Sequence, residues 1–337
     1  MNDADILRRL REKVGAEFRY ILEGDRCVEL GLFSADCIFH GLIRHHSASE
    51  KAEIITLIAR LECLRVLNLR RNLLLSLPES FGDLTELTYL DLGSNWLGKV
   101  PAWVPQLSKL EYLNLGVNRL DAVPETLSEL TNLKTLLVHK NNLTRLPEEY
   151  ASLRKLEYLN LYLNRIRAIP KFVWGLSSLK TFSWGVSSLS AVPEEIGALQ
   201  NLEFLTFVGN KLQYLPNTFC DLKNLKAARL HKNRLKELPG GIGRLRNLEQ
   251  VTLYQNELTE LPESFVDLKR LKRLNLSWNA FREFPRGVLR LPRLEWLAFF
   301  YNDPRIPMPD LTHIKEVILE KNQRPRVEAL HRALADE

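Results

Sequence analysis

The sequence has few cysteines and no long apolar segment, and both absences narrow the class of protein. Four cysteines are present, Cys27, Cys37, Cys63 and Cys220. They form no Cys-x-x-Cys pair, which argues against a disulfide framework and the common zinc and thiol-redox motifs, and we expect buried thiols. No run of about 18 apolar residues could span a membrane. The first residues, Met1 to Gly15, lack the apolar core of a signal peptide, so the prediction is a cytoplasmic protein.

Sequence signatures of catalysis and cofactor binding are also missing. The chain has no GxxxxGK[ST], HExxH or GxSxG motif, and no GxGxxG after a strand. The glycines at 240–243 fall in a return segment, where a turn explains them. His139 and His231 occupy equivalent places four repeats apart, on the order of 19 Å at the spacing of parallel strands, too far to share one zinc ion. We therefore expect no enzyme activity, no cofactor and no metal.

What is present is a repeat. The chain has 337 residues, 45% hydrophobic and 26% charged, which indicates a folded protein too long for one ordinary core of about 250 to 300 residues. Asparagine recurs at intervals of 23 or 46 residues, at positions 72, 95, 118, 141, 164, 210, 233, 256, 279 and 302, and Ser187 occupies the missing slot. Proline keeps the same period from Pro78 to Pro285. The two phase-locked columns predict an array of similar structural units.

One unit can be interpreted from its residue types. Leu67 and Leu69 alternate at period two and predict a short strand, and the constant period predicts parallel neighbours. The asparagine amide carries donors and an acceptor for backbone groups of the turn, so we expect Asn72 to be buried and hydrogen-bonded. Pro78 suits the first position of a helical return segment. Because one unit buries too little apolar surface to fold alone, neighbours must stack.

The repeat LxxLxLxxNxLxxLPxxhxxLxxL, seen in LRVLNLRRNLLLSLPESFGDLTEL, resembles the leucine-rich repeat. It is most similar to the 23-residue intracellular class found in Ras-pathway scaffolds, plant Ras-group proteins and many bacterial proteins, and the match covers about residues 61 to 322. The resemblance implies an α/β fold, a leucine-rich repeat solenoid (horseshoe) with a parallel β-sheet on the concave face and helical caps. It also implies protein binding without a shared chemistry.

The ends predict caps. Residues 1–60 are expected to form an N-terminal helical cap with an imperfect first repeat at Cys27 to Phe33, residues 61–322 the repeats, and residues 323–337 a C-terminal capping helix. An amphipathic helix is predicted over 2–22. A second helix should begin at Ser47, since Ser47 and Glu50 have the spacing of a capping box. The alternative is that residues 1–46 form a separate functional domain.

The inner face of the sheet is the candidate binding surface, because aromatic and arginine side chains stand there without a packing reason and such residues dominate interface hot spots. The last third of the chain is basic: residues 221–300 hold sixteen Lys and Arg against nine Asp and Glu. The candidate residues are Arg229, His231, Lys232, Tyr254, Arg273, Trp278, Trp296, Phe300 and Tyr301. The alternative is that these rings pack only on one another or under the C-terminal cap, and a second candidate surface carries Tyr89, Tyr112, Tyr158 and Tyr162.

These features predict an intracellular protein-protein interaction module that binds a protein with an acidic and partly apolar segment. The alternative is a regulatory subunit or inhibitor that uses the same face to block the active site of an enzyme. Nucleic acid is a weaker expectation because no RNA- or DNA-binding motif is present, and neither a membrane nor a small-molecule substrate is expected. The identity of a captured partner would separate the two hypotheses.

Overall fold

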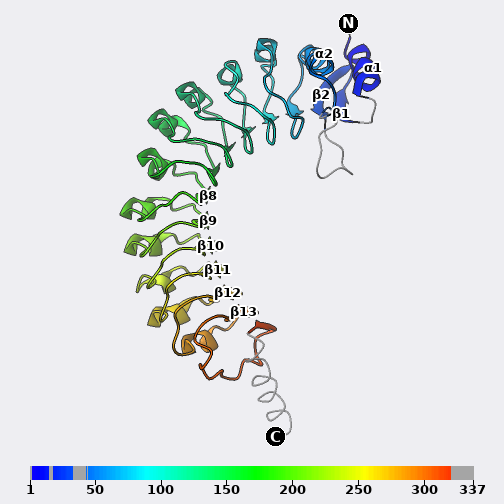
Figure 1. The fold of residues 1–337 in the computed structure, drawn as a ribbon. Coiled ribbons are helices and arrows are strands. Elements are labelled where there is room, and N and C mark those ends of the chain that lie inside the picture. The colour runs from blue at the N-terminus through cyan, green and yellow to red at the C-terminus, as the bar shows by residue number, and fades with distance from the viewer. Residues whose placement is uncertain (1, 15–17, 33–42, 44, 320–337) are drawn as a thin grey trace. The chain divides into compact units, whose positions relative to one another are not determined.

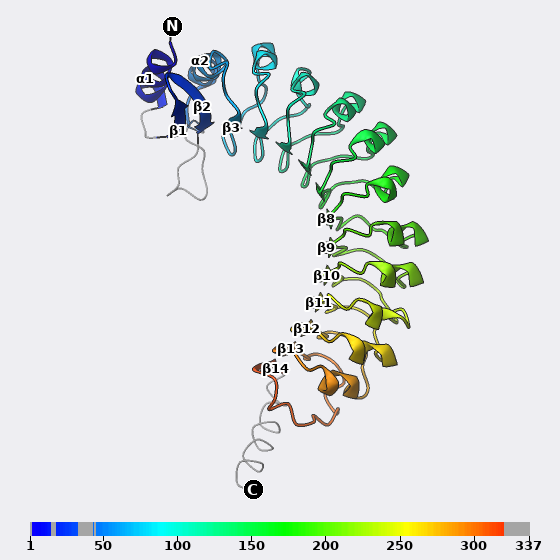
Figure 2. The ribbon, with the colours of Figure 1, turned by 180° about the vertical axis from the view of Figure 1, so that it is seen from behind.

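The fold was analysed in a computed structural model that describes residues 2–14, 18–32, 43 and 45–319. The chain divides into two compact units, Met1–Leu176 (unit 1) and Ser177–Glu337 (unit 2). The expected C-terminal capping helix at 323–337 and Cys37 lie outside the described residues. Figures 1 and 2 show, within each unit, short strands along one side of the repeats and helical turns along the other.

Unit 1 begins with helix α1 (Asp3–Val14), followed by strands β1 (Arg19–Glu23) and β2 (Arg26–Gly31), which pair antiparallel. The predicted helix over 2–22 is therefore wrong in its last part. Gly24, at φ 58°, and Asp25 form the two-residue connection of a hairpin, and this turn pairs residues 19–23 with β2 instead of continuing a helix. The expected first repeat strand is present, since β2 pairs in parallel with the next strand along the chain.

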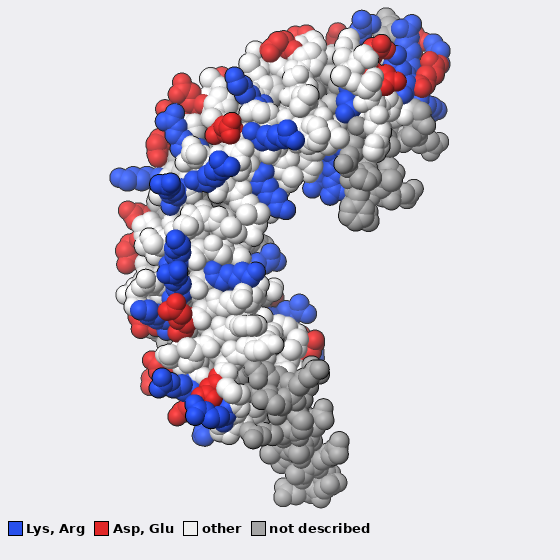
Figure 3. All heavy atoms as spheres, in the orientation of Figure 1, with Lys and Arg blue, Asp and Glu red and all other residues white. Residues whose placement is uncertain are grey.

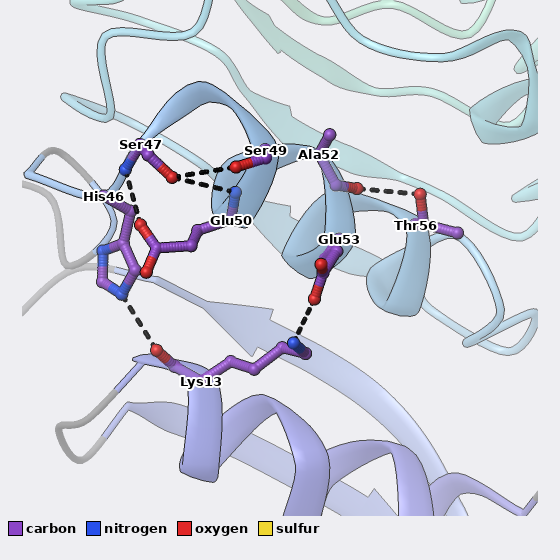
Figure 4. Close-up of polar contacts among 8 residues, drawn as sticks. All are labelled: Lys13, His46, Ser47, Ser49, Glu50, Ala52, Glu53 and Thr56. Carbon is purple, nitrogen blue, oxygen red and sulfur yellow. Dashed lines mark hydrogen bonds and ion pairs between the residues drawn. The ribbon is translucent and has the colours of Figure 1, made fainter.

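Helix α2 (Ala48–Ile58) starts as predicted. The Ser47 hydroxyl accepts from Glu50 N at 3.3 Å, and the Glu50 carboxylate accepts from Ser47 N at 2.7 Å. Hydrogen bonding to the Glu50 carboxylate, from the Ser47 side chain first and from the Ser47 backbone N–H second, holds the pKa of Glu50 below its ordinary value. Figure 4 shows how α1 reaches this helix: Lys13 forms an ion pair with Glu53, and its carbonyl oxygen lies 2.9 Å from His46 Nε2. The cap is thus tied together by polar contacts as well as by its apolar face.

The repeats of each unit contribute one three-residue strand apiece. In unit 1 these are β3 (Val66–Asn68), β4 (Tyr89–Asp91), β5 (Tyr112–Asn114), β6 (Thr135–Leu137) and β7 (Tyr158–Asn160). In unit 2 they are β8 (Thr181–Ser183), β9 (Phe204–Thr206), β10 (Ala227–Arg229), β11 (Gln250–Thr252), β12 (Arg273–Asn275), β13 (Trp296–Ala298) and β14 (Glu316–Ile318). Within each unit neighbouring repeat strands are parallel; from β3 to β13 equivalent residues pair, such as Gln250 with Arg273, as the fixed period predicts.

The return segments are helical, as predicted, and take the form of short 3₁₀ helices. Their bounds are Glu79–Asp83, Val104–Gln106, Glu125–Glu129, Glu148–Ser152, Lys171–Gly175, Glu194–Ala198, Asn217–Asp221, Ile242–Arg244, Glu263–Asp267 and Arg286–Arg290. Pro78 does not occupy the first helical position. It precedes the helix in an extended conformation, and its carbonyl oxygen accepts the first bond from Phe81 N at 3.2 Å. A 23-residue repeat leaves room for only one tight helical turn.

Most of the asparagine column is buried and hydrogen-bonded, including Asn72, as predicted, whereas Asn118, Asn279 and Asn302 are half-buried. Asn95 is 3% exposed; its Oδ1 accepts from Asn72 N and Leu74 N, both at 3.0 Å, and its Nδ2 donates to Leu69 O and Leu92 O, both at 3.0 Å. Each amide therefore joins the backbone of its own repeat to that of the preceding one. Leucine side chains fill the interior between strands and 3₁₀ helices.

The repeat of Ser187 packs differently, as its sequence predicts. Phe182 and Trp184 are buried where most other repeats have leucine, with ring centroids 6.4 Å apart. The Ser187 hydroxyl donates to Asn210 Oδ1 at 3.2 Å. Serine thus still hydrogen-bonds to the next asparagine of the column, and the rings of Phe182 and Trp184 fill the core.

Two thiols are buried, as expected: Cys27 and Cys220, while Cys63 is half-buried. Burial raises the pKa of Cys27 to about 12 and raises that of Cys220. Thiols with raised pKa values are poor nucleophiles, so both act as core residues.

Candidate protein-binding surface

The candidate residues lie on what we call the strand surface of unit 2, formed by the outward residues of β10 to β13 and the residues that follow each strand. Ala228, Val251, Leu274 and Leu297 point into the core, so their neighbours along each strand point outward. Arg273 lies between Gln250 and Trp296 in the register. Arg229 ends β10 and is exposed, as is Arg273, whereas Trp296 is half-buried. The predicted residues therefore share one face.

A left-handed turn follows each of these strands. The residue before each asparagine of the 23-residue column has a positive φ here: Lys232 (58°), Gln255 (55°), Trp278 (57°) and Tyr301 (55°). Residues other than glycine adopt this conformation at a cost of about 1–2 kcal/mol. The turn leaves Trp278 46% and Tyr301 54% exposed, with ring centroids 4.1 Å apart. Their exposure makes them the most accessible aromatic pair of the predicted set.

His231, Tyr254 and Phe300 form the adjoining column. The His231 and Tyr254 rings are stacked, with centroids 4.2 Å apart and an interplanar angle of 15°. His231 Nδ1 lies 3.0 Å from Thr252 Oγ1. Phe300 is half-buried and contacts Tyr301 edge to face at 5.4 Å. These half-buried rings support the exposed pair next to them.

His231 is not the cation that its place beside Arg229 and Lys232 suggests. Burial, with further contributions from the charges of Lys232 and Arg229, lowers its pKa from 6.5 to about 4. The imidazole is neutral near pH 7. The positive charge of this surface therefore comes from arginine and lysine.

This lowered pKa predicts a pH dependence of stability. Between pH 4 and 6.5 the unfolded chain binds the proton of His231 and the folded chain does not, so the free energy of unfolding should fall as the pH falls through this window. His231→Asn should make the decline shallower. Urea unfolding of both proteins at several pH values between 4 and 7 measures this, and equal slopes would contradict it.

The basic side chains divide into two groups. Lysines one repeat apart from glutamates form a ladder of ion pairs at the start of the strands: Lys226 with Glu203 at 2.7 Å, Lys272 with Glu249 at 2.8 Å, and Lys315, in the shortened last repeat, with Glu295 at 3.0 Å. None of the ion pairs between described residues involves Arg229, Lys232 or Arg273. In the view of Figure 3 the carboxylates lie mainly along the side of the 3₁₀ helices. The cations of the strand surface are therefore available to an anionic group.

Two exposed apolar residues on the same face were not among the predicted site residues. Phe204 in β9 is 46% exposed and Val186, in a left-handed turn, is 44% exposed. The signal for Phe204 was present in the sequence, because it stands in the strand column of Arg273 and Trp296. Val186 could not be found this way, since valine elsewhere in that column, at Val117, is only partly exposed.

In the second candidate surface, on unit 1, Tyr89 and Tyr112 are half-buried, whereas Tyr158 is exposed. Tyr89 and Tyr112 stack with centroids 4.1 Å apart at 7°. Asp91 is 3% exposed and accepts from Gly93 N and Asn114 Nδ2, and burial raises its pKa. Because these tyrosines and the carboxyl group are partnered within the fold, they offer less to a ligand than the rings of unit 2.

Across residues 2–14, 18–32, 43 and 45–319, no three His, Cys, Asp or Glu side chains come together as metal ligands would. In the same part of the chain no helix is both long enough and apolar enough to cross a membrane.

Known proteins share this repeat and fold. Sequence profiles described as leucine rich repeat match residues 63–84, 131–183 and 224–281. Among proteins with curated descriptions, no sequence matches. The leucine-rich repeat protein LIC12759 of Leptospira interrogans is 29% identical, with a TM-score of 0.68 over 81% of this chain and 72% of that one. An internalin (InlF) of Listeria monocytogenes, 22% identical with a TM-score of 0.62 over 70% and 68% of the two chains, shares the fold.

A third solved structure is described as a TLR13–ssRNA13 complex. It is 25% identical, with a TM-score of 0.63 over 80% of this chain and 42% of that one. The common fold is a leucine-rich repeat solenoid.

Proposed function

Because this chain is a leucine-rich repeat protein, we propose that it is an interaction module that binds another protein through the strand surface of unit 2. The observation that carries the proposal is the exposed ring pair Trp278 and Tyr301 on the same face as the cations Arg273 and Lys232. Tryptophan, tyrosine and arginine are the residues that dominate interface hot spots. A rigid repeat array that presents them in fixed positions loses little entropy on binding.

The chemistry of the surface suggests the chemistry of the partner. Arginine presents a planar fork that suits carboxylates, and the exposed rings suit apolar side chains. A partner segment that is acidic and partly apolar satisfies both. Its binding site comprises the predicted residues, with Phe204 as an addition.

Affinity capture with matched variants tests the location. Arg273→Ala and Trp278→Ala should each weaken binding of a captured partner at least about tenfold, as expected for a hot spot, while the unfolding transition stays close to that of the parent. Tyr158→Ala is the control, because Tyr158 is a comparably exposed ring, 37%, on β7 of unit 1. Raising the salt concentration should slow association. Equal binding by the parent and both unit 2 variants would reject this surface.

The same capture separates the other hypotheses. If a protein is still captured after nuclease treatment, the chain binds that protein directly. If nuclease treatment abolishes all capture, the ligand is a nucleic acid, as in the TLR13–ssRNA13 complex. If the partner is an enzyme, its activity in the presence of the parent and of Trp278→Ala distinguishes an inhibitor from a module that only docks.

A further inference from the structure

An apolar surface other than the two candidate surfaces lies near the N-terminus, within unit 1. A groove of about 480 Å³ runs between α2 and the turn after β3. Lys51, Ala52 and Ile55 of α2 form one wall, and Leu73, Leu75 and Trp96 form the other. We call it the α2 groove.

The floor of the groove has few polar groups to offer. Thr56, which also lines it, donates its hydroxyl to Ala52 O at 2.8 Å within the helix (Figure 4). Ala48 and Ala52 are small, which opens space beside the helix. The walls are therefore mainly apolar.

The repeat itself provides the comparison that makes this groove unusual. The position of Leu75 is polar, charged or glycine in every later repeat, for example Thr144, Lys236 and Thr259. The positions that follow Leu73 and Trp96 in their column are Arg119, Asn142, Arg165, Ser188, Lys211, Arg234, Glu257, Ala280 and Asp303. Large apolar residues at these loop positions are thus confined to the two repeats next to α2.

The N-terminal cap does not explain them. If these side chains served only to pack against α2, they would be buried by it, yet Leu75 is 68% exposed and Trp96 is 42% exposed. Leu73, on the same wall, has a left-handed backbone conformation, with φ 55°. Clustered apolar side chains that the fold leaves in water indicate a contact surface for another molecule.

The charges at the groove are positive. The guanidinium carbon of Arg119 lies 4.5 Å from the centre of the Trp96 ring. A guanidinium held by its face against a ring still presents its edge N–H groups to a carboxylate. Among the described residues that line the groove, the charged one is Lys51.

We propose that the α2 groove binds a short segment of a partner protein that presents two bulky apolar side chains next to a carboxylate. The apolar side chains contact Leu75 and Trp96, and the carboxylate accepts from Arg119. This contact is separate from the strand surface of unit 2, and neither site requires the other.

Selection from a phage-displayed library of random peptides on the full chain tests the proposal. The counter-selection variant carries Leu75→Thr and Trp96→Arg. Thr144 and Arg165 stand at the same positions of two later successive repeats, so the fold tolerates these residues. The enriched peptides should contain paired bulky apolar residues beside Asp or Glu. Their synthetic forms should bind the double variant at least about tenfold more weakly, and Arg119→Gln should weaken binding and its dependence on salt.

Several results would overturn it. Equal binding of the enriched peptides to the parent and the double variant places them elsewhere, and enriched peptides without a carboxylate remove the role of Arg119. A dimer in sedimentation velocity that the double variant abolishes would make a second copy of the chain the occupant. Trp278→Ala is the control, and it should bind these peptides like the parent, whereas loss of the unit 2 partner in that variant bears only on the proposed function.

Discussion

Gly243→Ala is expected to lower the free energy of unfolding by about 2–3 kcal/mol, toward the upper end of the usual cost of overpacking. Gly243 lies in the 3₁₀ helix Ile242–Arg244, where the next repeat approaches it closely. A Cβ atom at this position would clash with the backbone carbonyl of Ser264 and lie 2.8 Å from Asp267 Cβ. Because both contacts involve atoms close to the main chain, the two repeats would have to move apart.

Gly240 supplies the matched control for this prediction. It belongs to the same run of glycines, yet a Cβ at Gly240 would meet nothing within 4 Å. Gly240→Ala should leave stability unchanged or raise it by up to about 1 kcal/mol, since alanine restricts the unfolded chain. Denaturant unfolding of the two variants measures the difference. Similar effects at both positions would show that the close approach at Gly243 carries no strain.

The glycine run illustrates what the sequence could and could not predict. Its position in a return segment followed from the 23-residue period. The reason for glycine at 243 did not, because the clashing atoms belong to a repeat 21 residues later and depend on how closely two helical turns approach. Periodicity places residues in columns, whereas spacing between repeats depends on side-chain packing.

The strands and the asparagine column were predictable for a physical reason. Leu67 and Leu69 recur in phase with Asn72, and a pattern maintained over so many repeats leaves one register in which every leucine is buried. The exceptions fall where this pattern is absent. Residues 19–23 form a strand because of the turn at Gly24, and their apolar spacing was compatible with a helix as well.

The sequence predicted which residues lie on the strand surface of unit 2, but it did not predict their charge state or exposure. Column positions alone bring Arg229, Arg273 and Trp296 to one face. The lowered pKa of His231 and the exposure of Trp278 depend on how deeply each ring is buried, which its place in a column does not give. The role of this surface in binding stays a prediction.

The asparagine column leads to the second large effect: Asn95→Ala should lower the free energy of unfolding by about 3 kcal/mol. The substitution removes the acceptor of Asn72 N and Leu74 N. It also removes a donor to Leu69 O and Leu92 O, but these carbonyls still accept from the side-chain amides of Asn72 and Asn118, so the loss falls mainly on the two N–H groups. These groups lie in the interior, where each one left without a partner costs about 1–3 kcal/mol. Rearrangement of the turn can recover part of the loss, so the total is smaller than the sum.

Asn132→Ala is the control, because it removes an asparagine amide whose hydrogen bonds lie at the surface instead of in the interior. Asn132 also makes two hydrogen bonds, Nδ2 to Ser108 O at 3.0 Å and Oδ1 from Lys155 Nζ at 2.8 Å, but both are at the surface. Water replaces these partners, and the expected cost is below about 1 kcal/mol. Hydrogen exchange sharpens the test, because the amides of Asn72 and Leu74 should lose protection in Asn95→Ala and keep it in Asn132→Ala. If Asn95→Ala unfolds at the denaturant concentration of the parent, the amide ladder does not stabilise the junction between the first repeats, and leucine packing alone must hold them together.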